Sequence, residues 1–461
     1  MLAIVVSRED SASVNVGERL LELADWTARA DPDTPEPDGG GTYHRLEEGD
    51  ETGGASAELR TFETLHLHLE RPAAAFSETP DLLVFASRHA GDTDALLTAH
   101  TTGNVGPAEF GGEDYALAEA APNALARIRE AFAEHAPAGY EVGLECTHHG
   151  PTDVGCPSLF AELGSDEAQW EDSAGAEAVA RAILDLRGVD PYRERTVVGI
   201  GGGHYVHRFE RLVVETDWAV GHVASDWALA DVGDPREHPA VFREAFEASG
   251  ATRALLDGDA DTDATREFVA ELGYEVVSET WLRETSGVPL ELVERVEATF
   301  GPVAGGTRFG ERATSADTDG FVEATLPERL LEECVGIDRD RARAAVAERT
   351  VAFETAESGT VPTGAVLLDH TADRAAIVDA LLPLLESRYD EVARNADMAR
   401  NADTDTVTAR TREFDPEKAA TLGVSEGPAF GKLASGQAVE VGGRTIDPEA
   451  VTSVREETFE L

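Results

Sequence analysis

The chain has 461 residues, too many for one ordinary hydrophobic core, so two or three domains are expected. Its 90 acidic and 38 basic residues give a formal net charge of −52, with lysine only at Lys418 and Lys432. Such a surface repels itself in dilute buffer but is screened at molar salt, where the Debye length is about 3 Å. The charge therefore indicates a salt-rich cytoplasm, and it excludes the overall basic signature of nucleic-acid binders.

No apolar run approaches the roughly 20 residues that a membrane span requires. The amino terminus enters a strand pattern without a signal-peptide pattern. We therefore expect a cytoplasmic protein that does not contact membranes.

The first part of the chain alternates apolar strand patterns with helix patterns. In chain order these are a strand at 2–6, a helix at 16–28, strands at 61–69 and 82–86, a helix at 114–135 interrupted at Pro122, a strand from Tyr140, a helix at 174–186 and a strand at 196–200. Residues 31–57, rich in Asp, Glu, Gly and Pro, are predicted to form a surface insertion. This alternation predicts an α/β fold with a mostly parallel sheet flanked by helices.

The pattern of predicted elements and the content of reactive side chains change past about Thr285. Helix patterns occur at 289–300, 326–335 and 373–388, and a short β-like pattern occurs at 437–446. Reactive side chains become sparse here. We therefore predict a functional core at 1–285 and an accessory α+β region at 286–461.

Residues 145–164 hold the richest group of reactive side chains, including Cys146, the adjacent His148 and His149, and Asp153. They follow the strand pattern from Tyr140, and Gly-Pro-Thr predicts a turn just past the histidines. The histidines would then lie at a strand end, where open α/β sheets place ligand crevices. Histidine suits water activation at neutral pH, and imidazole, thiolate and carboxylate together suit zinc. The spacing matches no closed structural zinc site, so an open catalytic site is the alternative.

Two further features allow both a functional and a purely structural interpretation. Gly201, Gly202 and Gly203 follow an apolar strand and precede His204. Their N–H groups would suit an oxyanion, although an ordinary tight turn fits the same pattern. Ser158 lacks the GxSxG pattern of a nucleophile and is predicted to cap a helix start.

Arginine is locally abundant between residues 187 and 211, at Arg187, Arg193, Arg195, Arg208 and Arg211. With Arg88, Arg127 and Arg129 these side chains would suit a route for phosphates. Ordinary ion pairing with neighbouring acids is an equal alternative.

Six motifs occur in order within residues 1–285. They are VSREDSASVN at 6–15, SRH at 87–89, LTAHTTGN at 97–104, THHGPT at 147–152, PSLFAELGS at 157–165 and VGIGGGHYVHRF at 198–209. Together they resemble the D-aminoacyl-tRNA deacylase family of archaea and plants. The resemblance implies hydrolysis of the ester that joins a D-amino acid, or glycine, to the terminal ribose of tRNA. It also implies zinc dependence, a monomer, and a core similar to phosphorylase and peptidyl-tRNA hydrolase folds.

The candidate residues fall into three groups. For catalysis they are His148, His149 and His204; for substrate and oxyanion binding Gly201, Gly202, Gly203, Thr147, Thr152 and Arg88; for zinc His148, His149, His89 and Asp153. Three alternatives stay open: a zinc amidohydrolase or peptidase for small substrates, a nucleoside-phosphorylase-like enzyme, and a non-catalytic tRNA-binding protein.

The chain departs from the family pattern in its acidic insertion, its scarcity of lysine and the region after Thr285, which we expect typical members to lack. Within that region, GVSEGPAFGKL at 423–433 resembles a stretch near the end of ribonuclease Z.

Overall fold

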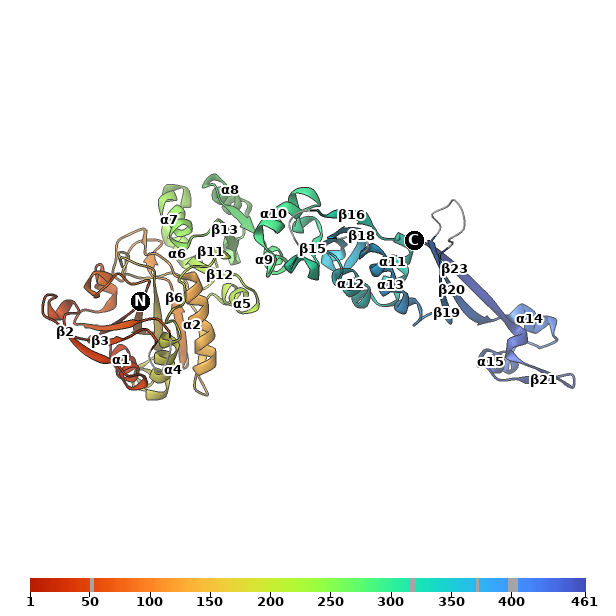
Figure 1. Ribbon diagram of the computed structural model, residues 1–461, viewed down its shortest axis with the longest axis horizontal. Coiled ribbons are helices and arrows are strands. Elements are labelled where there is room, and N and C mark those ends of the chain that lie inside the picture. The colour runs from red at the N-terminus through yellow and green to blue at the C-terminus, as the bar shows by residue number, and fades with distance from the viewer. Residues whose placement is uncertain (50–53, 316–319, 370–372, 397–404) are drawn as a thin grey trace. The chain divides into compact units, whose positions relative to one another are not determined.

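The structure is a computed structural model that describes residues 1–49, 54–315, 320–369, 373–396 and 405–461 (Figure 1). The chain forms two compact units, Met1–Ser286 and Gly287–Leu461. In the described residues, no helix has the length and apolar character needed to cross a membrane. All the candidate site residues belong to the first unit.

An eight-stranded sheet forms the centre of the first unit, in the order β2-β3-β4-β1-β5-β10-β6-β9. The strands are β1 (Leu2–Ser7), β2 (Thr27–Asp31), β3 (Gly41–Leu46), β4 (Ala57–Phe62), β5 (Leu82–Arg88), β6 (Leu96–His100), β9 (Glu141–Leu144) and β10 (Ser158–Gly164). Four of the seven neighbouring pairs are parallel, while β2–β3, β3–β4 and β6–β10 are antiparallel. The predicted α/β class is confirmed, with a mixed sheet in which β6 and β9 run against β5 and β10.

The two faces of this sheet carry different partners. Helices α1 (Ser11–Leu23), α2 (Pro122–His135) and α4 (Ser173–Leu184) pack together, with α1 against Val6 of β1. Alternate residues of a strand point to opposite faces, so Val5 belongs to a second cluster with Phe85 and Phe160. That second face continues from apolar residues into the histidine-rich region.

A second, wholly parallel sheet lies in the same unit, in the order β12-β11-β13-β14. Its strands are β11 (Thr196–Ile200), β12 (Ala219–Ala224), β13 (Arg253–Leu256) and β14 (Glu275–Val277). The helices of this part are α5 (His207–Glu215), α6 (Asp226–Val232), α7 (Pro239–Ser249), α8 (Asp263–Glu271) and α9 (Glu279–Thr285). A short helix, α3 (Glu167–Trp170), and the two-stranded β7 (Gly103–Asn104) and β8 (Ala116–Leu117) complete the unit.

The segment predicted to form a surface insertion, residues 31–57, contains regular structure in its described part. Thr27–Asp31 and Gly41–Leu46 form an antiparallel hairpin that extends the sheet, and residues 50–53 lie outside the described residues. A hairpin at the edge of a sheet is largely exposed and needs few apolar side chains. Most of β2 is indeed exposed, which explains the polar composition of this segment. Its charge also has a partner, since Asp31 lies 2.7 Å from Nη1 of the buried Arg60.

Two predicted helix boundaries also change. Ser158 does not cap a helix but begins β10, whose seven residues are all buried between β5 and β6. The helix predicted at 114–135 begins only at Pro122, because proline fits the first turn of a helix.

The second unit has its own core, built around a four-stranded sheet in the order β15-β17-β18-β16. Its strands are β15 (Thr307–Phe309), β16 (Val322–Thr325), β17 (Ala352–Ala356) and β18 (Val361–Leu368), and its helices are α10 (Leu290–Thr299), α11 (Glu328–Ile337), α12 (Arg339–Ala347) and α13 (Asp373–Leu385). The helices predicted at 289–300, 326–335 and 373–388 are confirmed.

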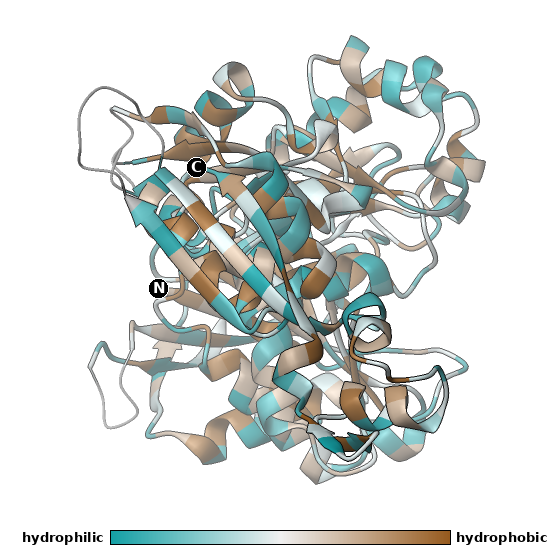
Figure 2. Cartoon of the chain, turned by 90° about the vertical axis from the view of Figure 1, so that its right-hand side faces the viewer, coloured by the Kyte–Doolittle hydropathy of each residue, from teal (hydrophilic) through white to brown (hydrophobic). Residues whose placement is uncertain are grey.

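The end of this unit is a three-stranded ribbon that carries a small module. The ribbon consists of β19 (Glu391–Ala396), β20 (Asp405–Phe414) and β23 (Thr452–Glu460), and the module of α14 (Pro416–Thr421), α15 (Pro428–Ala434), β21 (Val439–Val441) and β22 (Arg444–Ile446). Figure 2 shows hydrophobic and hydrophilic residues alternating along the long strands. Val407 and Ala409 of β20 are fully buried and belong to the core cluster of the second unit, so one face of the ribbon packs on that core.

Candidate active site

A cavity of about 370 Å³ with many titratable residues in its lining lies over the face of the large sheet that carries Phe85 and Phe160. Its titratable lining residues are Asp10, His66, Arg88, His89, Glu145, His148, His149, Glu162 and His204. They come from strands β5 and β10 and from the segments that follow β1, β4, β5, β9 and β11. The cavity therefore collects side chains that are far apart in the chain.

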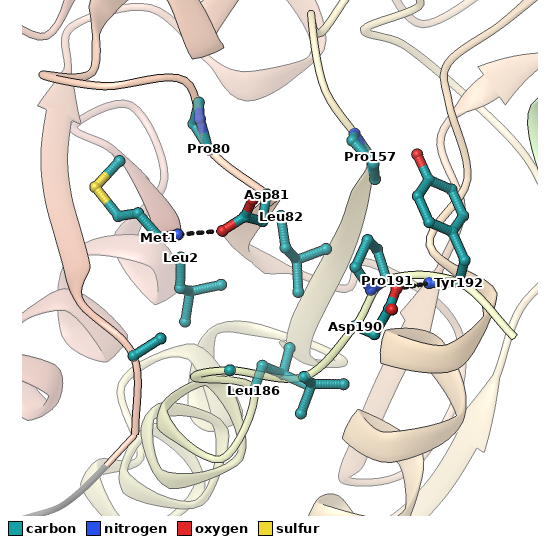
Figure 3. Close-up of a pocket in the computed structure, with 13 residues that line it drawn as sticks. Met1, Leu2, Pro80, Asp81, Leu82, Pro157, Leu186, Asp190, Pro191 and Tyr192 are labelled. Carbon is teal, nitrogen blue, oxygen red and sulfur yellow. Dashed lines mark hydrogen bonds and ion pairs between the residues drawn. The ribbon is translucent and has the colours of Figure 1, made fainter. Parts of the chain in front are cut away.

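Another cavity, of about 560 Å³, lies at the opposite ends of the strands (Figure 3). It is lined by Leu2, Leu82 and Pro157, which lie at or next to the amino ends of β1, β5 and β10. The amine of Met1, which also lines this cavity, pairs with Asp81. Open α/β sheets bind ligands beyond the carboxyl ends of their strands. Because this cavity has no histidine or cysteine in its lining, we place the candidate active site at the histidine-lined cavity.

Glu145 stands at the centre of that cavity. Its carboxylate is buried, and Oε2 lies 2.9 Å from Nε2 of His204 and 3.5 Å from Nε2 of His148. Oε1 lies 3.4 Å from Nε2 of His89. One carboxylate thus contacts three histidines from three separate segments.

Glu145 and His204 both have pKa values that favour their charged forms. Contacts with Cys146 and Glu145 raise the pKa of His204 to about 10. Burial would raise the pKa of Glu145, but the hydrogen bond from His204 and the neighbouring histidines lower it to about 2. At neutral pH the site therefore holds a His204 cation beside a Glu145 carboxylate.

In contrast, the pKa values of His148 and His149 favour the neutral form of each ring. Burial and the nearby His100 lower the pKa of both rings well below the ordinary value, so both are neutral. Nδ1 of His148 lies 2.9 Å from the Cys146 carbonyl oxygen, and Nδ1 of His149 lies 2.8 Å from the Gly150 carbonyl oxygen. Since a carbonyl only accepts, each Nδ1 carries the proton and each Nε2 is left with a free lone pair.

The sequence interpretation missed a buried pair beneath these rings, His100 and Glu162. His100 ends β6, stacks on Phe160 with ring centroids 5.1 Å apart, and lies 4.2 Å from the His148 ring. Its Nε2 lies 3.4 Å from Glu162 Oε1, and burial raises the pKa of Glu162 to about 7. Both residues lie within the quoted motifs LTAHTTGN and PSLFAELGS, which was the signal that could have found them.

Several predicted binding residues do not line this cavity. The Thr147 hydroxyl is buried and bonded to Thr101, His222 and the Val223 N–H, so it is occupied by structural partners. Thr152 and Asp153 line a separate cavity, and the Thr152 hydroxyl accepts the Glu113 N–H.

The glycine turn is partly committed to packing. The Gly201 N–H donates to the Ala224 carbonyl and is therefore unavailable to an oxyanion. A Cβ at Gly201 would lie 2.0 Å from the Asp257 carbonyl oxygen, and the residue has a φ of +93°. This position requires glycine because of its positive φ and because the backbone directly after β13 passes so close.

Comparison with known proteins gives consistent matches. A family model described as D-aminoacyl-tRNA deacylase matches residues 76–277. Proteins described as D-aminoacyl-tRNA deacylase from Natronomonas pharaonis and Haloarcula marismortui are 53% and 49% identical, over 100% and 97% of both this chain and their own. The chain belongs to the D-aminoacyl-tRNA deacylase family.

The family extends beyond these haloarchaea, since a relative with the same description from Methanococcoides burtonii is 31% identical over 98% of this chain and 94% of its own. The expectation that members lack the region after Thr285 is therefore wrong for these relatives. A solved structure described as a conserved protein of unknown function has a TM-score of 0.53 and 27% identity, covering 62% of this chain and 98% of its own.

The arginine route predicted for this deacylase-family chain is mostly accounted for by ion pairs. Arg195 pairs with Asp217, Arg208 and Arg211 pair with Glu279, Arg127 with Glu130, and Arg129 with Glu210. Arg187 donates to the Ala55 carbonyl and Arg193 to the Asn123 side chain. Arg88 differs, because it lines the cavity with its guanidinium over the Trp170 ring.

The donor set of the cavity fits the zinc ion that the family resemblance implies. Three trios have donor atoms within 4.8 Å of one another: His100, His148 and His149; Cys146, His148 and His204; His89, Glu145 and His204. Glu145 Oε1 is buried without a hydrogen-bond donor, as a ligand oxygen would be. Fixed Nδ1–carbonyl bonds, as at His148 and His149, are typical of metal-ligating histidines. Of the predicted ligands, these trios contain His89, His148 and His149 but not Asp153.

Proposed function

We propose that this cavity hydrolyses the ester bond of D-aminoacyl-tRNA, releasing the D-amino acid and free tRNA. The observation that carries the assignment is the buried Glu145 carboxylate in contact with His89, His148 and His204. Such a cluster combines a neutral base, a cation and an anion within one cavity. Ester hydrolysis needs a base for water and positive charge for the oxyanion.

The protonation pattern suggests the division of roles. Nε2 of His148 or His149 carries a free lone pair and is placed to accept the proton of an attacking water. The His204 cation, held by Glu145, stabilises negative charge as the carbonyl becomes tetrahedral. The N–H groups of Gly202 and Gly203, two residues and one residue before His204, are further candidates for the oxyanion, and the backbone around them would reject an L side chain.

We further propose that the site holds zinc through Glu145 and His89, with His148, His149, His100 or Cys146 completing the set. His204 becomes a ligand only when it gives up the proton that makes it a cation. Bound zinc supplies a Lewis acid that polarises a carbonyl and acidifies water. The chain itself orients these ligands, because the two Nδ1–carbonyl bonds fix the rings of His148 and His149.

We also propose that the protein acts as a cytoplasmic monomer with a core of the phosphorylase and peptidyl-tRNA hydrolase type. A cavity built by one chain supports the first point, and a mixed sheet flanked by helices is compatible with the second. Light scattering in molar KCl tests the oligomeric state.

The decisive experiment follows ester loss from D- and L-aminoacyl-tRNA in molar KCl, with and without chelator. We expect D-selective hydrolysis that falls by at least about 10²-fold in Glu145→Gln, whereas Glu141→Gln, at the exposed start of β9, is unaffected. Ester loss without D-selectivity contradicts the proposal. Binding of tRNA without release of the amino acid indicates a non-catalytic binder, and activity only on small amides indicates an amidohydrolase.

A further inference from the structure

An aromatic side chain stands exposed at the candidate active site. Phe110 lines the histidine-lined cavity and is 62% exposed. Among the six large hydrophobic side chains that are exposed in the described residues, it has the largest exposed fraction and alone lines this cavity.

The backbone around Phe110 is fixed to the catalytic turn. The Gly150 N–H donates to the Phe110 carbonyl oxygen at 3.0 Å. Asn104 Nδ2 donates to the carbonyls of Gly111 and Glu113, at 2.8 and 3.1 Å. The backbone that carries Phe110 is therefore anchored to the turn after His149, and the side chain lines the same cavity as His149.

Arg88 supplies the second observation. It is the only arginine or lysine lining the cavity, and its guanidinium lies 5.1 Å from the Trp170 ring centroid. The backbone N–H of Arg88 donates to Asp10 Oδ2 at 2.9 Å, but within the described parts of the chain no carboxylate forms an ion pair with the Arg88 guanidinium. In a chain of net charge −52, an arginine without an acidic partner is available to an external anion.

The substrate of the proposed reaction has matching chemistry. The scissile ester is attached to the terminal ribose, so the base and phosphate of the same nucleotide must lie close to the reacting carbon. Aromatic side chains stack on bases, and arginine binds phosphate. Molar salt weakens phosphate contacts much more than the apolar contact of a stacked ring.

We propose that Phe110 is a stacking platform for the base of the terminal tRNA nucleotide and that Arg88 binds the phosphate of that nucleotide. The inference rests on the proposed function and deepens it. It assigns recognition of this acidic protein's polyanionic substrate to one stacked base and one phosphate contact beside the ester.

The test measures KM and kcat on D-aminoacyl minihelices whose terminal ribose carries adenine or no base. With adenine, Phe110→Ala raises KM by roughly 5- to 150-fold, the range for one base–aromatic stack, with kcat within about twofold. Phe110→Trp keeps the wild-type KM. Removing the base raises KM for the wild type but not for Phe110→Ala, so the two changes are not additive. Val214→Ala, at an exposed residue that does not line the cavity, is the control.

For Arg88, Arg88→Gln raises KM on both minihelices and lowers the slope of log KM against log salt by about 1. The control is Arg243→Gln, at an α7 arginine that also forms no ion pair within the described residues. It leaves KM and the salt slope unchanged. Additive effects of base removal and Phe110→Ala, or an equal loss of kcat on both minihelices, overturn the inference while the wild type stays active. A wild type that hydrolyses neither minihelix instead overturns the proposed function, and the inference with it.

Discussion

Nε2 of His204 lies 2.9 Å from Glu145 Oε2, although the two residues are 59 positions apart in the chain. The contact joins the end of β9 to the turn after β11, and so links the two sheets of the first unit at the candidate active site. Its strength is measurable through the titration of His204, whose pKa is raised to about 10 by Cys146 and Glu145.

Glu145→Gln should lower the pKa of His204, because the variant removes the carboxylate that favours the cation. Two-dimensional NMR of histidine ring resonances across pH 6–11 measures the change. The matched variant Glu141→Gln should leave the titration unaltered. An unchanged pKa in Glu145→Gln would show that the two side chains do not interact in solution.

His148→Ala and His149→Ala separate the roles of the two neutral rings. Loss of the base or of a metal ligand should reduce the single-turnover rate on D-aminoacyl-tRNA by about 10²- to 10⁴-fold. His68→Ala changes a nearby exposed histidine outside this cavity and should keep full activity. Full activity in both His148→Ala and His149→Ala would refute the assignment of the base.

Zinc binding should release protons if His204 is a ligand. The raised pKa of His204 means that the folded apo-protein holds a proton there at pH 7, and a metal must displace it. Zinc affinity should therefore fall as the pH is lowered. Calorimetry in buffers of different ionisation enthalpy counts the protons released, and the number should decrease in His204→Gln.

His222 should make stability depend on pH in the acid range. Burial lowers its pKa from 6.5 to about 4, so between these values the unfolded chain binds a proton that the folded chain does not. Its contribution, of the order of 3 kcal/mol, is complete above pH 6.5 and is lost as the pH falls toward 4. Denaturant unfolding in molar KCl measures the free energy of unfolding at each pH. Between pH 6.5 and pH 4 this free energy should fall less in His222→Gln than in the wild type. The exposed His68→Gln should behave like the wild type.

The sequence was sufficient for local features. Adjacent histidines before a Gly-Pro turn identified the segment that contains His148 and His149, and apolar periodicity located β1, β5 and β11. Motif order carried the family assignment. These signals all lie within short windows of the chain.

The rest depended on tertiary contacts that no short window contains. Glu145 is a single acid among 90, and only the fold brings His89 and His204 to it. The reversal of β6, which delivers His100 to the same place, leaves no periodicity signal. The arginines near 187–211 were ambiguous for the same reason, because their acidic partners, such as Glu279, lie elsewhere in the sequence.

Thr147, the residue directly before His148 and His149, links the histidine turn to both sheets. Its hydroxyl bonds to Thr101 beyond β6 and to His222 and the Val223 N–H of β12, so it belongs to both sheets. The histidine turn cannot open without breaking contacts of the second sheet. The amides of Thr147 and Val223, which bond to Val223 and Thr147 respectively, should therefore exchange with solvent in one cooperative event.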